Sequence, residues 1–180
     1  VRFRTTQSGT LVSNAMPEGK WIPNGKTLFV AKNGKLTYDI GWVGAVTSRG
    51  KINDGQWHQI ALRWSHDDGS AELFIDGQPE GRSVLRPAEA VEGHVLRLGL
   101  AAPDFPERQT FFEGELREVK FIQRAVSREE IQDPETINYR LDIIDELGRF
   151  PVLVCCIESL LPVLRDLKYY ETFLALEWKT

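Results

Sequence analysis

This chain of 180 residues has two cysteines, no surplus of positive charge and no long apolar run. The two cysteines, Cys155 and Cys156, are neighbours, and because a bridge between adjacent cysteines is strained, we expect no disulfide framework. Lysine and arginine number 22 against 26 aspartates and glutamates, a formal net charge of −4. Proteins that bind nucleic acids usually carry a basic surplus, so we expect no nucleic-acid partner. No run reaches the roughly 18 apolar residues of a membrane span, so none is expected.

The composition nevertheless supports a folded domain with a real core. Hydrophobic residues make up 42% and charged residues 27% of the chain, which excludes the disordered and collagen-like classes. A chain of this length buries roughly 70% of the surface of its unfolded form, so the core alone can hold the fold. Residues Val1 to Thr6 do not begin with methionine and do not form a secretion signal. They look like part of a β-strand whose first residues are not included. We therefore expect a piece of a longer protein, or a chain numbered from after a cleavage.

Residues 1 to about 126 alternate short β-rich runs with clusters of glycine, asparagine and aspartate, a spacing typical of an all-β sandwich. Asn33-Gly34 predicts a hairpin, because both residues tolerate the positive φ angles of a two-residue turn. Asp67-Asp68-Gly69-Ser70 and Asp76-Gly77 predict two further turns. The expected strands span residues 1–6, 26–31, 35–40, 43–48, 57–65, 71–75, 95–100 and 111–123.

Several expected strands carry apolar side chains on both faces. Leu28 and Val30 share one face of their run while Phe29 lies on the other. We expect one face to pack on a second sheet and the other to line a groove or lie under loops. Trp57 and Trp64 are both expected in the core.

The last expected strand breaks the period of two. Leu116 lies on one face while Val119 and Phe121 fall on the other. A one-residue β-bulge near Arg117-Glu118 would bring all three side chains to the core side.

Beyond residue 126 glycine almost disappears and the pattern becomes helical. Ser127 at the N-cap and Glu130 three residues later form a capping box that opens a short helix. Residues 133–148 and 152–164 predict two more helical segments, and residues 172–178 alternate like a strand. We expect the segment 152–164 to pack on the sandwich or on the preceding helix; the alternative is a helix that binds a partner.

Three motifs follow one another in the first part of the chain. They are Asp54-Gly55-Gln56-Trp57-His58, Leu73-Phe74-Ile75-Asp76-Gly77-Gln78, and Phe112-x-Gly114-x-Leu116-x-Glu118-Val119-x-Phe121 with Arg124 to Ile131 behind it. This order and spacing resemble the laminin G-like members of the concanavalin A-like lectin/glucanase superfamily. The resemblance implies a mainly β fold, an antiparallel jelly-roll β-sandwich over residues 1–132. Residues 133–180 then form an α-helical C-terminal appendage, ending in a possible strand, with no family resemblance of its own.

One departure from the family pattern concerns the first strand. The family normally has at least one more strand before Val1, and this sequence lacks it. A missing strand leaves an open sheet edge, which is an aggregation hazard. Either the chain begins earlier, or another segment covers that edge. Residues 172–178 have the length and the alternation to pair with residues 1–6.

The stretch Tyr38-Asp39-Ile40-Gly41-Trp42 sets aromatic rings beside a carboxylate. Rings stack on the apolar faces of sugars and carboxylates accept hydrogen bonds from hydroxyls, so this stretch suits sugar recognition. Tyr38, Asp39 and Trp42 are therefore candidate ligand-binding residues, and Trp21, in the loop of residues 19–24, could join them. The alternative is that Trp42 belongs to the core and that Trp21 covers loop backbone.

Calcium is the one cofactor that the resemblance suggests, because laminin G-like domains often hold it at a loop rim through carboxylate and backbone oxygens. The loop acids Asp67, Asp68 and Asp104 are the candidate ligands. No EF-hand-like pattern supports them, so acids that shape the turns are the favoured interpretation. The histidines show no zinc-ligand spacing, and His58, near Asp54, is expected to be structural rather than a ligand or base.

Glu113 and Glu115 are two residues apart, so both face one side of the expected strand. Glycosidases use paired carboxylates as nucleophile and acid/base, which makes this pair a candidate for glycan cleavage. The glycosidases of this superfamily generally show a denser Glu-x-Asp-x-Glu array, which the chain lacks. A solvated sheet face is favoured, and no catalytic residue is assigned.

The predicted function is that of a non-catalytic module that recognises carbohydrate or protein within a larger, extracytoplasmic protein, a location taken from the resemblance. Its expected partners are a glycan or protein ligand and the other domains of the parent chain. Two alternatives stay open: a structural spacer or interaction domain without its own ligand, and a glycan-cleaving enzyme using Glu113 and Glu115.

Overall fold

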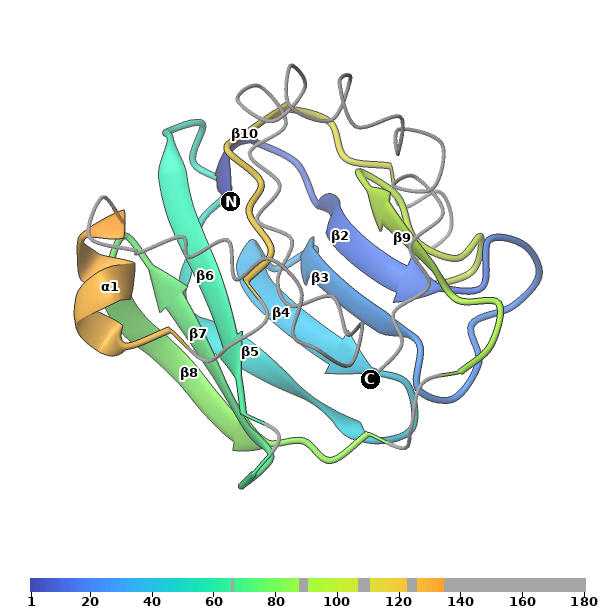
Figure 1. Ribbon diagram of the computed structural model, residues 1–180. Coiled ribbons are helices and arrows are strands. Elements are labelled where there is room, and N and C mark those ends of the chain that lie inside the picture. The colour runs from blue at the N-terminus through green and yellow to red at the C-terminus, as the bar shows by residue number, and fades with distance from the viewer. Residues whose placement is uncertain (66, 88–90, 107–110, 123–125, 135–180) are drawn as a thin grey trace, which may run out of the picture.

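The computed structural model describes residues 1–65, 67–87, 91–106, 111–122 and 126–134 (Figure 1). These residues form two antiparallel five-stranded sheets with the strand orders β10-β1-β6-β7-β8 and β5-β4-β3-β2-β9. The elements are β1 (Arg2–Arg4), β2 (Gly9–Ala15), β3 (Lys26–Val30), β4 (Lys35–Ile40), β5 (Gly44–Lys51), β6 (His58–Trp64), β7 (Ser70–Ile75), β8 (Gln78–Val84), β9 (Val95–Leu98), β10 (Glu115–Arg117) and α1 (Arg128–Gln132). The expected antiparallel jelly-roll sandwich, with helix only at its C-terminal end, is confirmed within the described residues.

Turn chemistry fixes two of the hairpins at the positions predicted. The hairpin between β3 and β4 lies where predicted, but the expected two-residue turn is wrong, because residues 31–34 separate the strands and Asn33 has no positive φ. Gly34 has a φ of 81°, and a side chain there would collide with the side chain of Asn53. Asp76 and Gly77 have φ values of 50° and 75° between β7 and β8. Two consecutive positive φ angles are the signature of a type I′ turn, whose twist matches that of the paired strands.

The two sheets enclose one apolar core between their inner faces. Its members are Phe3, Leu11, Leu28, Val30, Leu36, Tyr38, Ile40, Val46, Ile52, Ile60, Ala71, Leu73, Ile75 and Leu85. Trp64 packs against this core, as expected, and its indole N–H donates to the carbonyl of Leu85 at 3.0 Å.

The expectation that Trp57 lies in the core is wrong. Trp57 is out of phase with Ile60 and Trp64, so its ring lies on the outer face of the sheet. There the guanidinium carbons of Arg117 and Arg4 lie 4.5 Å and 5.3 Å from the centre of the ring. These cation–π contacts stabilise the ring at the surface without burying it completely.

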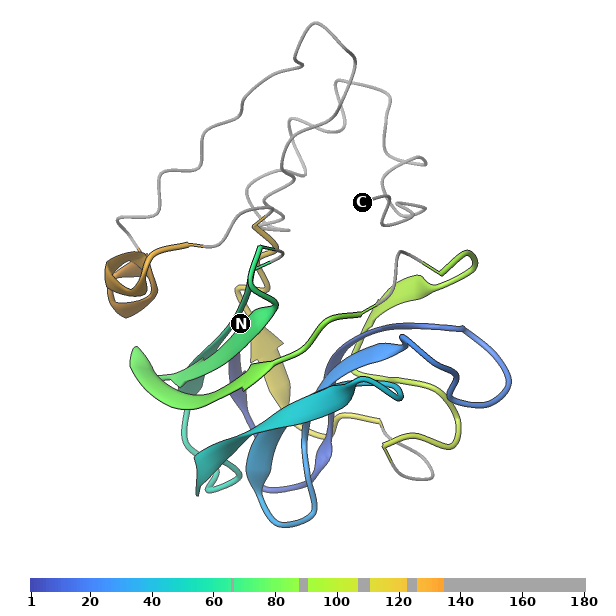
Figure 2. The ribbon, with the colours of Figure 1, turned by 90° about the horizontal axis from the view of Figure 1, so that it is seen from below.

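The two sheets meet along one margin, where β5 runs beside β8 (Figure 2). The backbone N–H groups of Arg49 and Gly50 each donate to the carboxylate of Glu80 at 3.1 Å. A side chain at Gly81 would stand 2.7 Å from the carbonyl oxygen of Thr47, so glycine permits this close approach. This margin of the sandwich is therefore closed by direct contact between the sheets.

The segment that follows β9 crosses the outer face of the second sheet. The hydroxyl of Ser13 in β2 donates to the carbonyl of Leu100 at 2.6 Å. The ring of Phe105 meets the ring of Phe29 edge-on, with 6.1 Å between centroids. The second apolar face of β3 therefore lies under a loop, as its sequence predicts.

Strand β1 has no free edge, because it pairs with β10 on one side and β6 on the other. The expected pairing of residues 1–6 with residues 172–178 is therefore wrong for Arg2–Arg4. Strand β10 is shorter than the predicted run 111–123 and ends where Glu118 adopts a φ of 50°. This break replaces the expected bulge, and it lets Leu116 pack on the core while Val119 is also buried.

Helix α1 begins with the capping box that its sequence predicts. The side chain of Ser127 accepts from the backbone N–H of Glu130 at 3.2 Å, and the Glu130 carboxylate accepts from the N–H of Ser127 at 2.7 Å. The carbonyl of Ile131 accepts from the side chain of Gln59 at 3.3 Å, which ties the helix to β6. No helix within the described ranges is long and apolar enough to cross a membrane. The elements predicted beyond residue 134 lie outside the described residues.

His58, the first residue of β6, ties two turns together. Its Nδ1 lies 2.7 Å from Oδ2 of Asp76, and its Nε2 lies 3.2 Å from Oδ1 of Asp54. Burial acts to lower the pKa of His58, but the hydrogen bonds and charges of the two carboxylates outweigh it, so the pKa is raised. These contacts give His58 the structural position expected from its sequence context.

Replacing His58 with glutamine should remove a pH-dependent part of the stability. The folded state favours the imidazolium, so its contribution is complete below the ordinary pKa of about 6.5 and is lost as the pH rises through the higher folded-state pKa. Urea unfolding of both proteins from about pH 5.5 to 8.5 should show the largest difference in free energy of unfolding at the acidic end. A difference that stays constant over this range would contradict the role of His58.

Gly114 should tolerate no side chain. A Cβ there would collide with the carbonyl oxygen of Arg4 and stand 2.9 Å from the ring of Phe112, so the pairing of β1 with β10 would have to shift. We expect Gly114→Ala to lower the free energy of unfolding by about 1–3 kcal/mol. Gly50→Ala is the matched control, because its Cβ would meet only Glu80 at an ordinary 3.8 Å. Equal unfolding midpoints for Gly114→Ala and the wild type would refute the packing argument.

Candidate functional site

Trp42 stands at the turn between β4 and β5 and is 74% exposed. Its φ is 61°, a left-handed conformation that a large side chain rarely adopts. The turn lies outside the in–out alternation of the strands, so nothing directs this indole into the core. The alternative that Trp42 is a core residue is therefore wrong.

Trp21 lies against the backbone beside Trp42. Its ring stacks on Phe105, with 4.3 Å between centroids and 13° between planes. A side chain at Gly41 would stand 2.9 Å from the indole nitrogen of Trp21, and one at Gly25 would stand 3.0 Å from its ring. Trp21 therefore covers loop backbone, as the alternative predicts. The loop is anchored by the backbone N–H of Trp21, which donates to the carboxylate of Asp104 at 2.7 Å. Trp21 and Phe105 thus lie beside the turn that carries Trp42, and we call these three residues the aromatic rim.

The two β4 candidates face opposite ways. Tyr38 alternates in phase with Leu36 and Ile40 and lies in the core at 8% exposure, so it does not contribute to the aromatic rim. Asp39 points to the outer face and is half-buried, and burial raises the pKa of its carboxyl. Within the described residues, no side-chain hydrogen bond engages this carboxylate, so it can accept one from a ligand.

The three acids proposed for calcium do not come together. The described part of the chain contains no group of three or more histidine, cysteine, aspartate or glutamate side chains that could hold a metal ion. Asp104 is engaged by Trp21, while Asp68 accepts from the N–H of Ser70 at 2.8 Å in the turn between β6 and β7. Hydrogen bonds from Ser70 are the main reason that the pKa of Asp68 falls to about 2. Asp67 is an exposed residue of the same turn.

The paired glutamates also have separate roles. Glu115 forms ion pairs with Arg4 and with Arg117, and the pKa of its carboxyl is lowered, chiefly by the hydrogen bond from Arg4. Glu113 contributes its backbone, since its carbonyl accepts from the hydroxyl of Thr5 at 2.6 Å. An acid/base catalyst needs a raised pKa, and Glu115 is shifted in the opposite direction.

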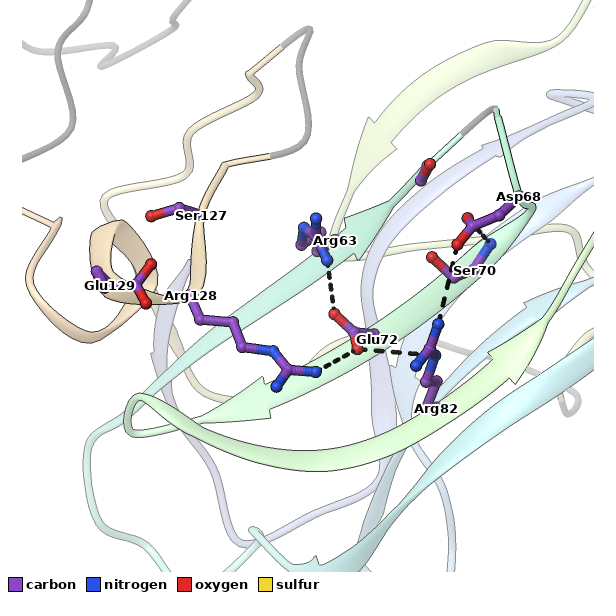
Figure 3. Close-up of a pocket in the computed structure, with 9 residues that line it drawn as sticks. Arg63, Asp68, Ser70, Glu72, Arg82, Ser127, Arg128 and Glu129 are labelled. Atoms are coloured by element: carbon purple, nitrogen blue, oxygen red, sulfur yellow. Dashed lines mark hydrogen bonds and ion pairs between the residues drawn. The ribbon is translucent and has the colours of Figure 1, made fainter.

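A polar pocket of about 330 Å³ lies on the outer face of the first sheet, beside the start of α1 (Figure 3). Strand register places Arg63, Glu72 and Arg82 side by side on β6, β7 and β8. Arg128, the first residue of α1, reaches toward the same glutamate. The lining is completed by Asp68, Glu129 and three serines.

Glu72 is the centre of this pocket, and its side chain is only 5% exposed. One carboxylate oxygen lies 2.8 Å from Arg63, while the other lies 2.8 Å from Arg128 and 3.7 Å from Arg82. Burial acts to raise the pKa of Glu72, but the hydrogen bonds and charges of Arg128 and Arg63 outweigh it and lower the pKa. The carboxylate therefore stays ionised and holds the guanidinium groups around it.

Sequence reasoning missed this pocket, although a signal for it was present. Arg63 shares the outward phase of its run with Gln59 and Ala61. Counting back from the turn that follows β6 pairs Arg63 with Glu72, and the next hairpin pairs Glu72 with Arg82. Three alternating charges across three consecutive strands indicate a polar face, once the register of both hairpins is known.

Comparisons with known proteins agree with this architecture. A laminin G-type family model, described as the concanavalin A-like lectin/glucanases superfamily, matches residues 3–132. A mouse protein named "Sushi, von Willebrand factor type A, EGF and pentraxin domain-containing protein 1" is 30% identical over 86 residues. Neuronal pentraxin-2 of Cavia porcellus is 27% identical over 122 residues. These matches cover 47% and 58% of the chain but only 2% and 28% of the relatives' own lengths.

Among solved structures, the chain is similar to a native heptameric SAP-like pentraxin from Limulus polyphemus. The TM-score is 0.50 at 18% identity, and the match covers 73% of this chain and 65% of the pentraxin chain. At this identity the likeness shows a shared fold. The family match, in contrast, spans well over half of the sequence and contains all three motifs that carry the resemblance. This protein therefore belongs to the concanavalin A-like lectin/glucanases superfamily.

Proposed function

We propose that this chain is a non-catalytic recognition module that binds a glycan at the aromatic rim. The observation that carries the proposal is Trp42, a large aromatic side chain that is 74% exposed at a turn. An indole ring stacks on the apolar face of a sugar while its N–H remains available to a hydroxyl. The ring is thus suited to a ligand that is apolar on one face and polar at its edge.

The backbone of Trp42 supports a role in binding rather than in folding. A left-handed conformation costs an ordinary residue about 1–2 kcal/mol, and glycine would avoid that cost. The exposed ring returns little burial energy to the fold. Strain of this kind tends to occur at functional sites, where the position of the side chain matters more than local stability.

Neighbouring groups complete a surface that a sugar could use. Trp21 lies beside Gly41, next to Trp42 in the chain, and its ring stacks on Phe105. Asp39, on the strand that leads into the turn, offers carboxylate oxygens as acceptors for hydroxyl groups. Calcium enters only as a condition of the test, because the three candidate acids do not form a metal site within the described residues.

The absence of catalysis is part of the proposal. The lowered pKa of Glu115 supports it, because a carboxylate held ionised by arginines makes a poor general acid. A larger parent protein outside the cytoplasm is proposed too. Its support is the mouse relative, whose printed name combines pentraxin with several other domain types, and which is far longer than this chain.

A role as an interaction domain without its own glycan is the second candidate. Strand β9 favours it, since Val95, Leu96 and Leu98 are 37–40% exposed on a sheet edge. Exposed apolar side chains on an edge strand suit contact with another domain. A glycan array separates the two candidates, because only the first predicts a signal that depends on Trp42.

Replacing Trp42 with glycine should uncouple binding from stability. Glycine relieves the left-handed strain, so the free energy of unfolding should stay equal or rise by up to about 1 kcal/mol. Retention on immobilised neutral and acidic glycans, with and without calcium, should fall about tenfold or more when the ring is lost. Trp42→Phe should keep part of the retention, because a smaller ring can still stack.

Val84→Ala is the matched control, since Val84 is another exposed apolar residue, on β8, at 62% exposure. It should leave glycan retention unchanged. If Trp42→Gly instead unfolds the protein, or retains glycans as well as the wild type does, Trp42 is not a binding residue. An array without any signal for the wild-type protein would favour the interaction domain.

A further inference from the structure

We propose that the polar pocket beside α1 is a binding site for an oxyanion, meaning a carboxylate, sulfate or phosphate group. The pocket lies on the first sheet, whereas the aromatic rim belongs to the second. The inference therefore stands independently of the glycan proposal. It is carried by three features of the pocket: its charge arrangement, its free hydrogen-bond donors and its size.

The charge arrangement gathers cations around one buried anion. Arg128 and Arg82 both approach Oε1 of Glu72, at 2.8 Å and 3.7 Å, while Arg63 approaches Oε2 at 2.8 Å. One carboxylate thus faces three guanidinium groups, and like charges at this spacing repel one another. Asp68 lies 3.8 Å from Arg82, and Glu129 also lines the pocket, so the lining holds three acidic side chains for its three arginines. A bound anion would accept the hydrogen bonds that these acids leave unmade.

The same guanidinium groups have donors to spare. The side chain of Arg82 makes no hydrogen bond within the described residues, since both of its acidic neighbours are beyond 3.5 Å. The Nε of Arg63 is buried and also lacks a partner there. Buried donors in proteins are nearly always paired with a protein group or an ordered water, so this N–H in the pocket wall can donate to an acceptor bound there. Guanidinium groups match the geometry of oxyanions by donating two parallel hydrogen bonds.

The pocket has room for a small ligand. Its volume of about 330 Å³ lies at the lower end of the range of about 300–1,000 Å³ found for ligand sites. Arg128 and Arg82 reach Glu72 from opposite sides, while the Glu129 side chain stays beside the helix (Figure 3). An oxyanion alone, or one carried by a single sugar ring, fits this space.

The experiment measures affinity by isothermal titration calorimetry, with four probes and the whole chain. Glucuronate, glucose 6-phosphate and sodium sulfate carry the oxyanion, and glucose is the neutral comparison. We expect the oxyanion probes to bind and glucose not to bind. Tighter binding of glucuronate and glucose 6-phosphate than of sulfate would identify a saccharide as the carrier of the oxyanion. Equal binding of all three would identify a free ion as the ligand.

Arg82→Gln is the decisive variant, because Arg82 is 61% exposed and makes no hydrogen bond that the fold would lose. It should weaken oxyanion binding about tenfold. Arg82→Lys keeps the charge but lacks the planar guanidinium group that donates two parallel hydrogen bonds, so it should retain only part of the wild-type affinity. Arg117→Gln makes the same charge change at 64% exposure on β10 and should leave the affinity unchanged. The proposal is overturned if glucose binds as well as the anions, if no anion binds, or if Arg117→Gln weakens binding as much as Arg82→Gln.

Discussion

The burial of one face of each sheet against the other is the interaction on which this structure depends. Each large apolar side chain removed from water, such as Phe3, Leu73 or Ile40, contributes about 1.5–3 kcal/mol to folding. Since successive residues of a strand point to opposite faces, a core residue fixes the orientation of both its neighbours. The inward position of Leu73 therefore sends Glu72 outward, into the polar pocket. The apolar core thus determines where the charged groups stand.

Local chemistry could be predicted from the sequence, because its causes lie within a few residues. The type I′ turn at Asp76-Gly77 and the capping box of Ser127 and Glu130 both appear where expected. Strand β8 was missed because Val84 is its one large apolar residue, and β2 was missed because Leu11, Val12 and Ala15 do not alternate along it. Thr10 and Ser13 of β2 are fully buried, and the acceptor of Ser13 is Leu100, far along the chain. Partners at such a distance leave no local pattern.

The candidate site likewise contains residues that could be predicted from local pattern and residues that could not. Tyr38 could have been assigned to the core, since it alternates in phase with Leu36 and Ile40, and Trp57 could have been assigned to the surface by the same rule. The exposure of Trp42 could not be predicted in this way, because a turn residue does not follow the in–out alternation of a strand. The position of the Trp42 side chain depends on the φ angle of Trp42, and that angle follows from how the turn connects β4 to β5.

The two proposed sites illustrate why a sandwich of this kind can carry binding surfaces at a small cost in the free energy of folding. The aromatic rim requires one strained turn residue, and the polar pocket requires one desolvated carboxylate, Glu72. Either penalty amounts to a few kcal/mol, which the burial of two or three core side chains offsets. Trp42 and Arg82 are 74% and 61% exposed and neither belongs to the apolar core cluster, so changes there alter recognition while the sheets stay packed. Residues such as Phe3, between β10 and β6, have no such freedom, because their replacement opens the core itself.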